Sequence, residues 1–149
     1  ESYRAQGDIG AARKILAQAA PFGEHDADLA YAEALLLIDE GKRGKATEKF
    51  AEAAARAPGN ARYAYVRAIS VHDEGDGRKA LALLEDAAAR FPHDRFILRG
   101  AADYAAEAGE RNKALGYARR LHTLLPDDAE TAALIKRLEE EKKETPSRD

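Results

Sequence analysis

Residues 56–66 read "RAPGNARYAYV", and elements of the turn at the centre of this stretch recur along the chain. The proline of Pro58-Gly59-Asn60 returns at Pro92 and Pro126, each 34 residues further on. The same interval separates four residues of types suited to a helix N-cap: Asp26, Asn60, Asp94 and Asp128. A fixed period of this length predicts a repeat architecture, in which each unit buries its apolar face against its neighbours.

Two further sets of residues recur at the interval of 34 residues, and we call each such set of equivalent positions a column. The first is Gly7, Gly41, Gly75 and Gly109, and the second is Ala12, Ala46, Ala80 and Ala114. In the unit from Ala61 to Asp94, helix-forming residues follow Asn60 and continue to Gly75, where a helix would stop. A second helical run begins near Arg78 and ends before Phe91-Pro92. Each unit is therefore predicted to be a helix, a turn and a second helix.

These columns resemble tetratricopeptide repeats, whose pattern includes a small residue, then A-x3-F, then P. The chain shows the pattern three times: Ala34, Ala46-x3-Phe50, Pro58; Ala68, Ala80-x3-Leu84, Pro92; and Ala102, Ala114-x3-Ala118, Pro126. The chain departs from the family pattern in one respect. The large side chain expected at the fourth position of a unit stands one residue earlier, as Tyr63 does before Ala64. The resemblance implies an all-α, right-handed α-solenoid of antiparallel helix-turn-helix units with a C-terminal capping helix.

The repeat register predicts a single domain over residues 1–149. Its parts are a partial repeat (1–26), three repeats (27–60, 61–94 and 95–128), a capping helix (129–144) and a disordered tail (145–149). The absence of methionine, even at position 1, leads us to expect that the chain is a piece of a longer protein.

Composition excludes several classes of function. A net charge of -3 gives no overall positive field for nucleic acid, and no apolar stretch approaches the ~18 residues of a membrane-spanning helix. We therefore expect no nucleic-acid partner and no membrane insertion. The chain has no cysteine, which excludes disulfides, thiolate metal sites and a cysteine nucleophile.

Catalytic and metal-binding patterns are also missing from the sequence. The four histidines, none four residues from another, are His25, His72, His93 and His122. Such spacing does not place two ligands on one helical face, and no nucleophile stands near a base in a recognised pattern. We expect no metal, no cofactor and no enzymatic activity.

Function is then expected on a surface. In the family that the chain resembles, the first helices of the units line a concave groove that receives a peptide or a partner helix. The positions that share the corresponding face are Tyr31, Leu35, Ile38, Arg62, Tyr65, Ile69, His72, Phe96, Arg99 and Asp103. Tyrosine and aliphatic side chains in the first two units predict an apolar or aromatic anchor on the partner. Of the two tyrosines in the opening stretch, Tyr63 is predicted to be core and Tyr65 to face the groove.

Other interpretations of these residues stay open. The aliphatic side chains can instead be buried between helices beneath the tyrosines, and Arg99 can simply pair with Asp103 four residues later. Some members of the family bind the terminal carboxylate of chaperones through a lysine and an asparagine five and nine residues into a unit. Tyr65 and Ile69 hold these positions in the second unit, so that clamp is absent.

The alternative function is a structural spacer or self-association module within a larger bacterial protein. In the predicted register, no helix covers the N-terminal end around Tyr3, Ile15 and Leu16. Two copies of the chain could therefore form a homodimer through this end. Residues Asn60 to Arg95 also resemble repeats attached to multihaem cytochrome c regions in bacterial proteins. That resemblance favours the periplasm over the cytoplasm, and both compartments stay open.

Overall fold

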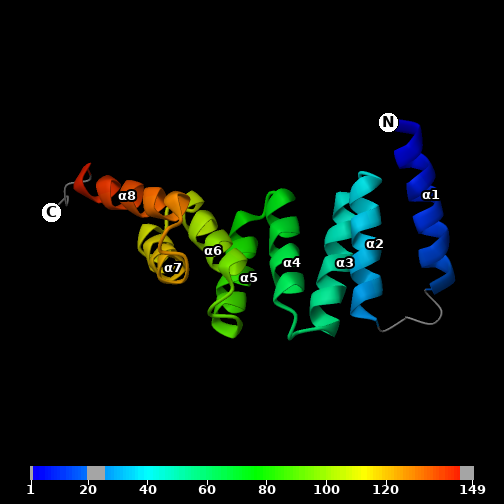
Figure 1. Ribbon diagram of the computed structural model, residues 1–149, viewed down its shortest axis with the longest axis horizontal. Coiled ribbons are helices and arrows are strands. Elements are labelled where there is room, and N and C mark those ends of the chain that lie inside the picture. Colours follow the sequence, from blue (N-terminus) through cyan, green and yellow to red (C-terminus); the bar gives the residue numbers. More distant parts are fainter. Residues whose placement is uncertain (1, 20–25, 145–149) are drawn as a thin grey trace. The chain divides into compact units, whose positions relative to one another are not determined.

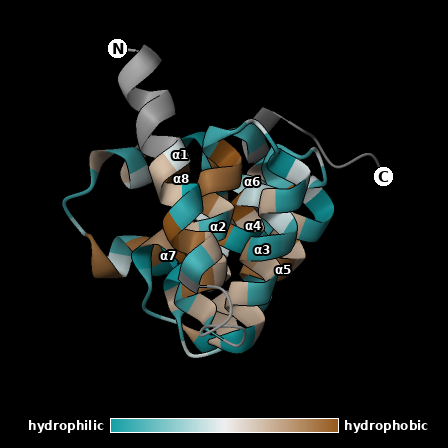
Figure 2. Cartoon of the chain, turned by 90° about the vertical axis from the view of Figure 1, so that its right-hand side faces the viewer, coloured by the Kyte–Doolittle hydropathy of each residue, from teal (hydrophilic) through white to brown (hydrophobic). Residues whose placement is uncertain are grey.

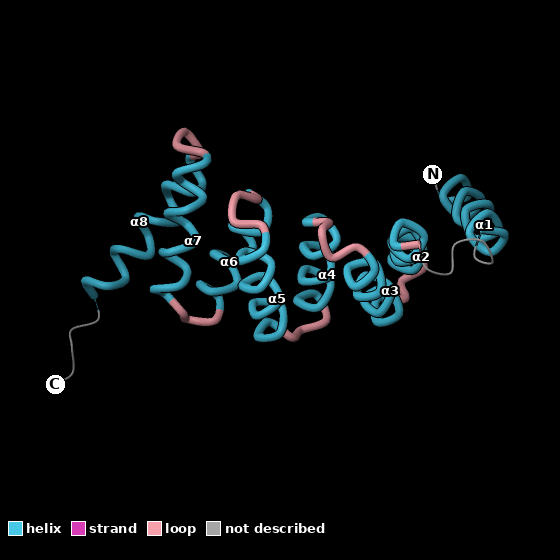
Figure 3. The backbone as a smooth tube through the Cα atoms, turned by 90° about the horizontal axis from the view of Figure 1, so that it is seen from below, coloured by secondary structure: helices cyan, strands magenta, loops and turns pink. Residues whose placement is uncertain are grey.

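The computed structural model describes residues 2–19 and 26–144, with side chains for 10–18 and 26–141. Within these ranges the chain forms α-helices that are joined by short loops, with no β-strand (Figure 3). It divides into two compact units, Glu1–Gly75 and Asp76–Asp149. The predicted tail, His25 and the remainder of residues 20–25 lie outside the described residues.

Unit 1 holds four helices, and each packs on the one that precedes it (Figure 1). They are α1 (Ser2–Ala19), α2 (Ala27–Asp39), α3 (Arg43–Arg56) and α4 (Ala61–Asp73). Small side chains lie at the helix crossings, since Ala34 and Ala46 are fully buried beside Phe50. Alanine at such crossings lets two helix backbones approach closely.

Unit 2 also holds four helices that pack in chain order. They are α5 (Gly77–Arg90), α6 (Arg95–Glu107), α7 (Arg111–Leu124) and α8 (Ala129–Glu144). The largest fully buried side chains of the whole described chain all lie in this unit: Leu84, Ile97, Leu98, Leu121 and Thr131. Hydrophobic and hydrophilic residues alternate as brown and teal bands along the helices (Figure 2), as expected of helices with one buried face.

The predicted N-caps are confirmed. Asp26 accepts a hydrogen bond from the backbone N–H of Asp28, and Asn60 accepts one from Tyr63. Asp94 caps α6 in the same way, and Asp128 accepts from the N–H of Thr131 at the start of α8. Each side chain satisfies a backbone donor that a helix start leaves without a partner.

The turn glycines follow the prediction except at the first position. Gly41, Gly75 and Gly109 have φ of 75°, 95° and 75°, a left-handed conformation that glycine adopts without strain and that ends a helix. Gly7 shares their column, but α1 runs through it from Ser2 to Ala19. The interval of 34 residues alone therefore does not mark a turn at Gly7.

Candidate functional site

Three of the predicted groove residues come together in unit 1. Ile38 from α2 and Tyr65 and Ile69 from α4 line one hollow of about 260 Å³, which we call the α2–α4 hollow. Tyr65 and Ile69 are four residues apart, so they lie on the same face of α4. The remaining lining residues are Arg43, Phe50, Val66, Ser70 and Asp73.

The walls of this hollow are fixed by packing beneath them. Phe50, from α3, is only 5% exposed and contacts the buried alanines Ala34 and Ala46. Ser70 on α4 is hydrogen-bonded to Thr47 on α3, with 2.5 Å between the two hydroxyl oxygens. A side chain that enters the hollow would therefore meet a preformed apolar wall, which lowers the entropic loss on binding.

Tyr31 does not reach this hollow. Its ring stacks on Tyr63, with 5.0 Å between the centroids, and lies 5.8 Å from Phe50. The guanidinium of Arg62, another predicted groove residue, lies 5.5 Å from the centre of the Tyr31 ring. Tyr31 and Arg62 thus form a stacked pair over the core, while Leu35 and Ile38, which the shielding interpretation buries beneath the tyrosines, are 44% and 40% exposed.

Tyr63 is buried, as the sequence predicts, and its hydroxyl donates a hydrogen bond to the carboxylate of Asp28. Burial first, and then the Asp28 carboxylate, raise the pKa of Tyr63 to about 12. Tyr63 therefore keeps its proton at any physiological pH and joins α4 to the start of α2.

Leu35 belongs to a different hollow, between α1 and α2. This α1–α2 hollow has a volume of about 350 Å³ and is lined by Ala12, Ile15, Leu16, Ala32, Leu35, Leu36 and Asp39. Ile15 is 64% exposed and Leu35 is 44% exposed at its edge. At the same side of unit 1, Arg13 on α1 pairs with Glu40 just after α2.

His72 lies near the end of α4 and is half-buried. Its Nδ1 is 4.0 Å from a carboxylate oxygen of Asp73, the last residue of that helix. Within the chain's described residues, no group of three or more His, Cys, Asp or Glu could hold a metal ion.

In unit 2, Arg99 has partners that differ from the pairing considered from the sequence. It pairs with Asp128, at 2.5 Å, and with Glu130, at 2.9 Å, and also donates to the hydroxyl of Thr131. All three partners lie at the start of α8, so the pairing of Arg99 with Asp103 is replaced by a contact between helices. The interval of four residues could not reveal this, because the partners follow about 30 residues later.

Phe96 and Asp103 are the remaining predicted groove residues. Phe96 is 52% exposed, and the guanidinium of Arg95 lies 4.9 Å from its ring centre. Asp103 lines a hollow of about 460 Å³ between α6 and α8, with Tyr104, Ala106, Glu107, Arg137, Leu138 and Glu141. Burial is the main cause that raises the pKa of Asp103, against the nearby Arg99 guanidinium.

The hollows of the two units use equivalent repeat positions with different chemistry. Two intervals of 34 residues relate Ile38 to Ala106, Ile69 to Arg137 and Asp73 to Glu141. The position that is apolar at Ile69 is a cation at Arg137, and unit 2 adds carboxylates at Asp103 and Glu107. The α2–α4 hollow is thus the mainly apolar one of this pair.

Part of the α2–α4 hollow comes from residues outside the predicted groove positions. Arg43 and Phe50 lie on α3, a second helix of a repeat, although Phe50 already stood in the A-x3-F pattern. Asp73 follows Ile69 by four residues, which was a usable signal that the two share one face of α4.

The comparisons with known proteins bear on the fold. No protein-family model matches the chain, and no curated protein matches it in sequence. The crystal structure of MamA is similar, with a TM-score of 0.79 and 16% identity over 95% of this chain and 82% of that one. The structure of pilF from Pseudomonas aeruginosa is also similar, with a TM-score of 0.75 and 19% identity over 96% of this chain and 65% of that one.

A third similar structure is the first tetratricopeptide domain of Spaghetti (RPAP3), bound to the HSP90 peptide SRMEEVD. Its TM-score is 0.68, with 14% identity over 78% of this chain and 94% of that domain. The resemblance to repeats of multihaem cytochrome c proteins stays a prediction. No helix among the described residues combines the length and the apolar character needed to span a bilayer. The helix pairs, the caps and these similarities together give the chain the tetratricopeptide-repeat fold.

Proposed function

We propose that the chain is a non-catalytic scaffold that binds a peptide or protein segment on the face formed by the first helices of its repeats. The observation that carries the proposal is the α2–α4 hollow, where Ile38, Tyr65 and Ile69 from two first helices line one apolar space. A solved structure with the same fold holds a peptide, which supports the same kind of use here.

The chemistry of the hollow favours an apolar or aromatic anchor on the partner. Its walls include two aromatic rings, Tyr65 and Phe50, and aliphatic side chains that a buried anchor can contact. Full burial of one leucine or phenylalanine contributes about 1.5 to 3 kcal/mol. A micromolar affinity requires about 8 kcal/mol, so the segment must also contact the rim of the hollow.

The partner is expected to differ from a chaperone terminus. Tyr65 and Ile69 occupy the positions where the chaperone-binding members of the family carry a lysine and an asparagine. The chain thus places apolar groups where a terminal carboxylate would need a cation and an amide. The remaining predicted groove residues, including Phe96 and His72, belong to the proposal as contacts outside the hollow.

The proposal is tested with peptides selected from a displayed library of random 12-residue sequences, using the full 149-residue chain as bait. Tyr65→Ala combined with Ile69→Ala should weaken the recovered peptides about tenfold or more in titration calorimetry, because both anchor contacts are lost. Ile15→Ala, an exposed apolar residue outside the α2–α4 hollow, is the matched control. Unchanged affinity in the double variant would overturn the proposal.

A second candidate function is self-association through the α1–α2 hollow. The observation in its favour is that Ile15 and Leu35 expose 64% and 44% of their surface beside that hollow. If this face joins two copies, sedimentation velocity will show a dimer at micromolar concentration that Ile15→Glu abolishes and Lys14→Glu keeps. A monomer for the unaltered chain at all concentrations would rule this candidate out.

A further inference from the structure

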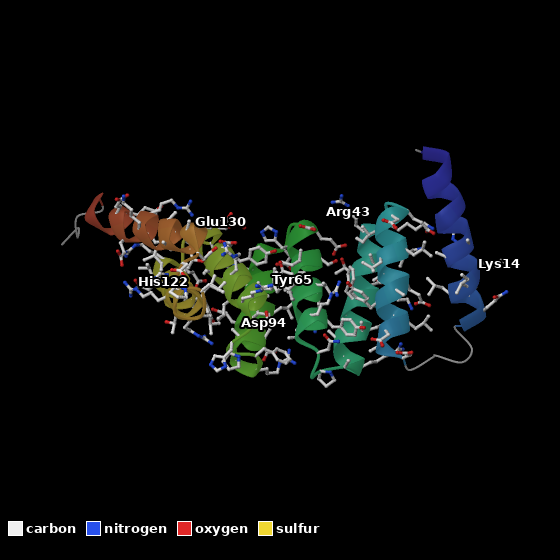
Figure 4. The ribbon with its side chains drawn as sticks, viewed as in Figure 1. Lys14, Arg43, Tyr65, Asp94, His122 and Glu130 are labelled. Atoms are coloured by element: carbon white, nitrogen blue, oxygen red, sulfur yellow. The ribbon has the colours of Figure 1, made fainter. Side chains whose placement is uncertain are left out.

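The α2–α4 hollow has one charged end. Arg43 is the first residue of α3 and Asp73 is the last residue of α4, and both line the hollow together with Ile38 near the end of α2. Figure 4 shows Arg43 at the upper end of α3, while Tyr65 lies further down α4. The hollow therefore passes from apolar walls at Tyr65 to a rim with one cation and one anion.

These two charges are available to a ligand. Among the described residues, the Arg43 guanidinium has no ion-pair partner, and the Nδ1 atom of His72, on the same helix as Asp73, lies 4.0 Å from the Asp73 carboxylate. The Asp73 side chain is 58% exposed. Arg43 and Asp73 also make no ion pair with each other, although both line the same small space.

Glu74 is the other charge close to this end, and its position gives it a different role. One of its carboxylate oxygens would lie 3.3 Å from a Cβ placed on Gly44. Glu74 thus faces the first turn of α3, where the positive end of the helix dipole favours an anion. It does not line the hollow, so Arg43 and Asp73 remain the charges that a bound segment meets.

We propose that the α2–α4 hollow selects a peptide segment in which an apolar anchor is accompanied by one acidic and one basic side chain. This inference rests on the proposed function and adds the charge pattern of the partner to it. The anchor fills the space between Tyr65, Ile69 and Phe50. Its acidic neighbour pairs with Arg43 and its basic neighbour with Asp73.

The pairing of charges also fixes the direction of the segment. Arg43 and Asp73 lie on different helices, so a segment bound in the reverse direction would place like charges together. Like charges in contact disfavour the wrong orientation, and opposite charges stabilise the right one. Arg43 can bind a carboxylate with two parallel hydrogen bonds, which adds geometric selectivity to the charge.

The test compares peptide selections on four forms of the full chain: unaltered, R43E, D73K and the double variant. Random 12-residue displayed peptides are the probe. The unaltered chain should enrich an apolar residue with an acidic neighbour on one side and a basic one on the other. R43E should replace the acidic neighbour by a basic one, D73K should replace the basic neighbour by an acidic one, and the double variant should exchange their order.

Affinities give a second readout that does not depend on sequence statistics. The best peptide of the unaltered chain should bind R43E and D73K about threefold to tenfold more weakly, since each reversal turns one attractive exposed pair into a repulsive one. Lys45→Glu, on the same helix as Arg43 but outside the hollow, is the matched control and should leave its affinity unchanged. Circular dichroism of all variants confirms that the helices are intact.

The outcomes separate this inference from the function on which it rests. If apolar peptides are enriched and lose affinity with Tyr65→Ala, but R43E and D73K select the same charges as the unaltered chain, the charge pattern is wrong and the scaffold function stands. If no form enriches peptides that depend on Tyr65, both are wrong.

Discussion

Tyr63 and Tyr65 lie two residues apart on α4 and have opposite environments. Because two residues of an α-helix are separated by about 200°, one ring turns into the core where the other lines the α2–α4 hollow. Tyr63 is 5% exposed and donates to Asp28, whereas Tyr65 lines the hollow with Ile69. The interval of 34 residues predicted this division, since Tyr63 shares a column with Ile97 and Tyr65 shares one with Tyr31.

Tyr63→Phe should lower the free energy of unfolding by about 1 to 2 kcal/mol at pH 7, because it removes a hydrogen bond to a carboxylate. Tyr31→Phe is the matched control, since the Tyr31 hydroxyl has no hydrogen-bond partner within the described part of the chain. Urea titration of both variants measures the difference. Equal stability of Tyr63→Phe and the unaltered chain would show that the bond to Asp28 adds nothing.

The Tyr63–Asp28 hydrogen bond also leads to a prediction at high pH. The pKa of Tyr63 rises to about 12 in the folded chain, against an ordinary value of 10.0. Between these values the unfolded chain releases a proton that the folded chain keeps, so the stability due to Tyr63 is complete below pH 10 and is lost as pH rises toward 12. The stability difference between the unaltered chain and Tyr63→Phe should shrink over this window, and a constant difference would contradict the assignment.

Three of the predicted groove residues make contacts with neighbouring helices that sequence reasoning did not identify. Tyr31, Leu35 and Arg99 stand in columns that the register assigns to the groove, but each interacts with a neighbour that the column does not encode. Tyr31 stacks on Tyr63, Leu35 lies beside Ile15 of α1, and Arg99 pairs with Asp128. The position of a residue in the repeat determines the helix face on which its side chain lies. The side chains of the adjacent helices determine what that side chain contacts.

The helix α8 illustrates how one element is held in place. Asp128 caps it, accepts from the Thr131 hydroxyl and pairs with Arg99 of α6, while Leu138 is buried two turns later. The helix also exposes Lys136 and Glu139, and its role as a capping helix stays a prediction. Its docking thus combines a polar cluster at its start with the buried Leu138 further along, where the Arg111 side chain also donates to the Leu138 carbonyl.

Asp128→Ala should loosen α8 selectively, because it removes the cap and the Arg99 pair together. Amide hydrogen exchange in α8 should become about three- to tenfold faster, with little change in α5. Asp127→Ala, the exposed neighbour, is the matched control. If exchange in α8 matches that of the control, Asp128 does not hold the helix.

The contribution of Asp128 to stability should also depend on pH. Hydrogen bonds from Thr131, followed by the Arg99 guanidinium, hold the pKa of Asp128 below its ordinary value of 3.8. A lowered carboxyl pKa stabilises the folded state above that ordinary value, and the contribution disappears as pH falls through the folded-state pKa. The difference between Asp128→Ala and Asp127→Ala should therefore be present at pH 6 and vanish in stronger acid.

For the whole chain, the sequence was sufficient to predict the helix-turn-helix repeats. Helix caps and turn glycines recur every 34 residues, and each of them determines only the local backbone structure. The 34-residue register also selected Ile38, Tyr65 and Ile69 as residues of one face. The predicted groove positions did not include the charged end of the hollow: Arg43 lies on a second helix, and only the spacing of four residues from Ile69 pointed to Asp73. The interval likewise does not distinguish the turns at Gly41, Gly75 and Gly109 from the continuous helix at Gly7.

The proposed function places the binding surface of this chain at the α2–α4 hollow. Its most direct test is a titration of the ¹⁵N- and methyl-labelled chain with a peptide recovered from the random library, followed by nuclear magnetic resonance. The methyl groups of Ile38, Val66 and Ile69 should show the largest shifts, and Tyr65→Ala should remove these shifts. Shifts confined to Ile15 and Leu35, or to α7, would contradict it.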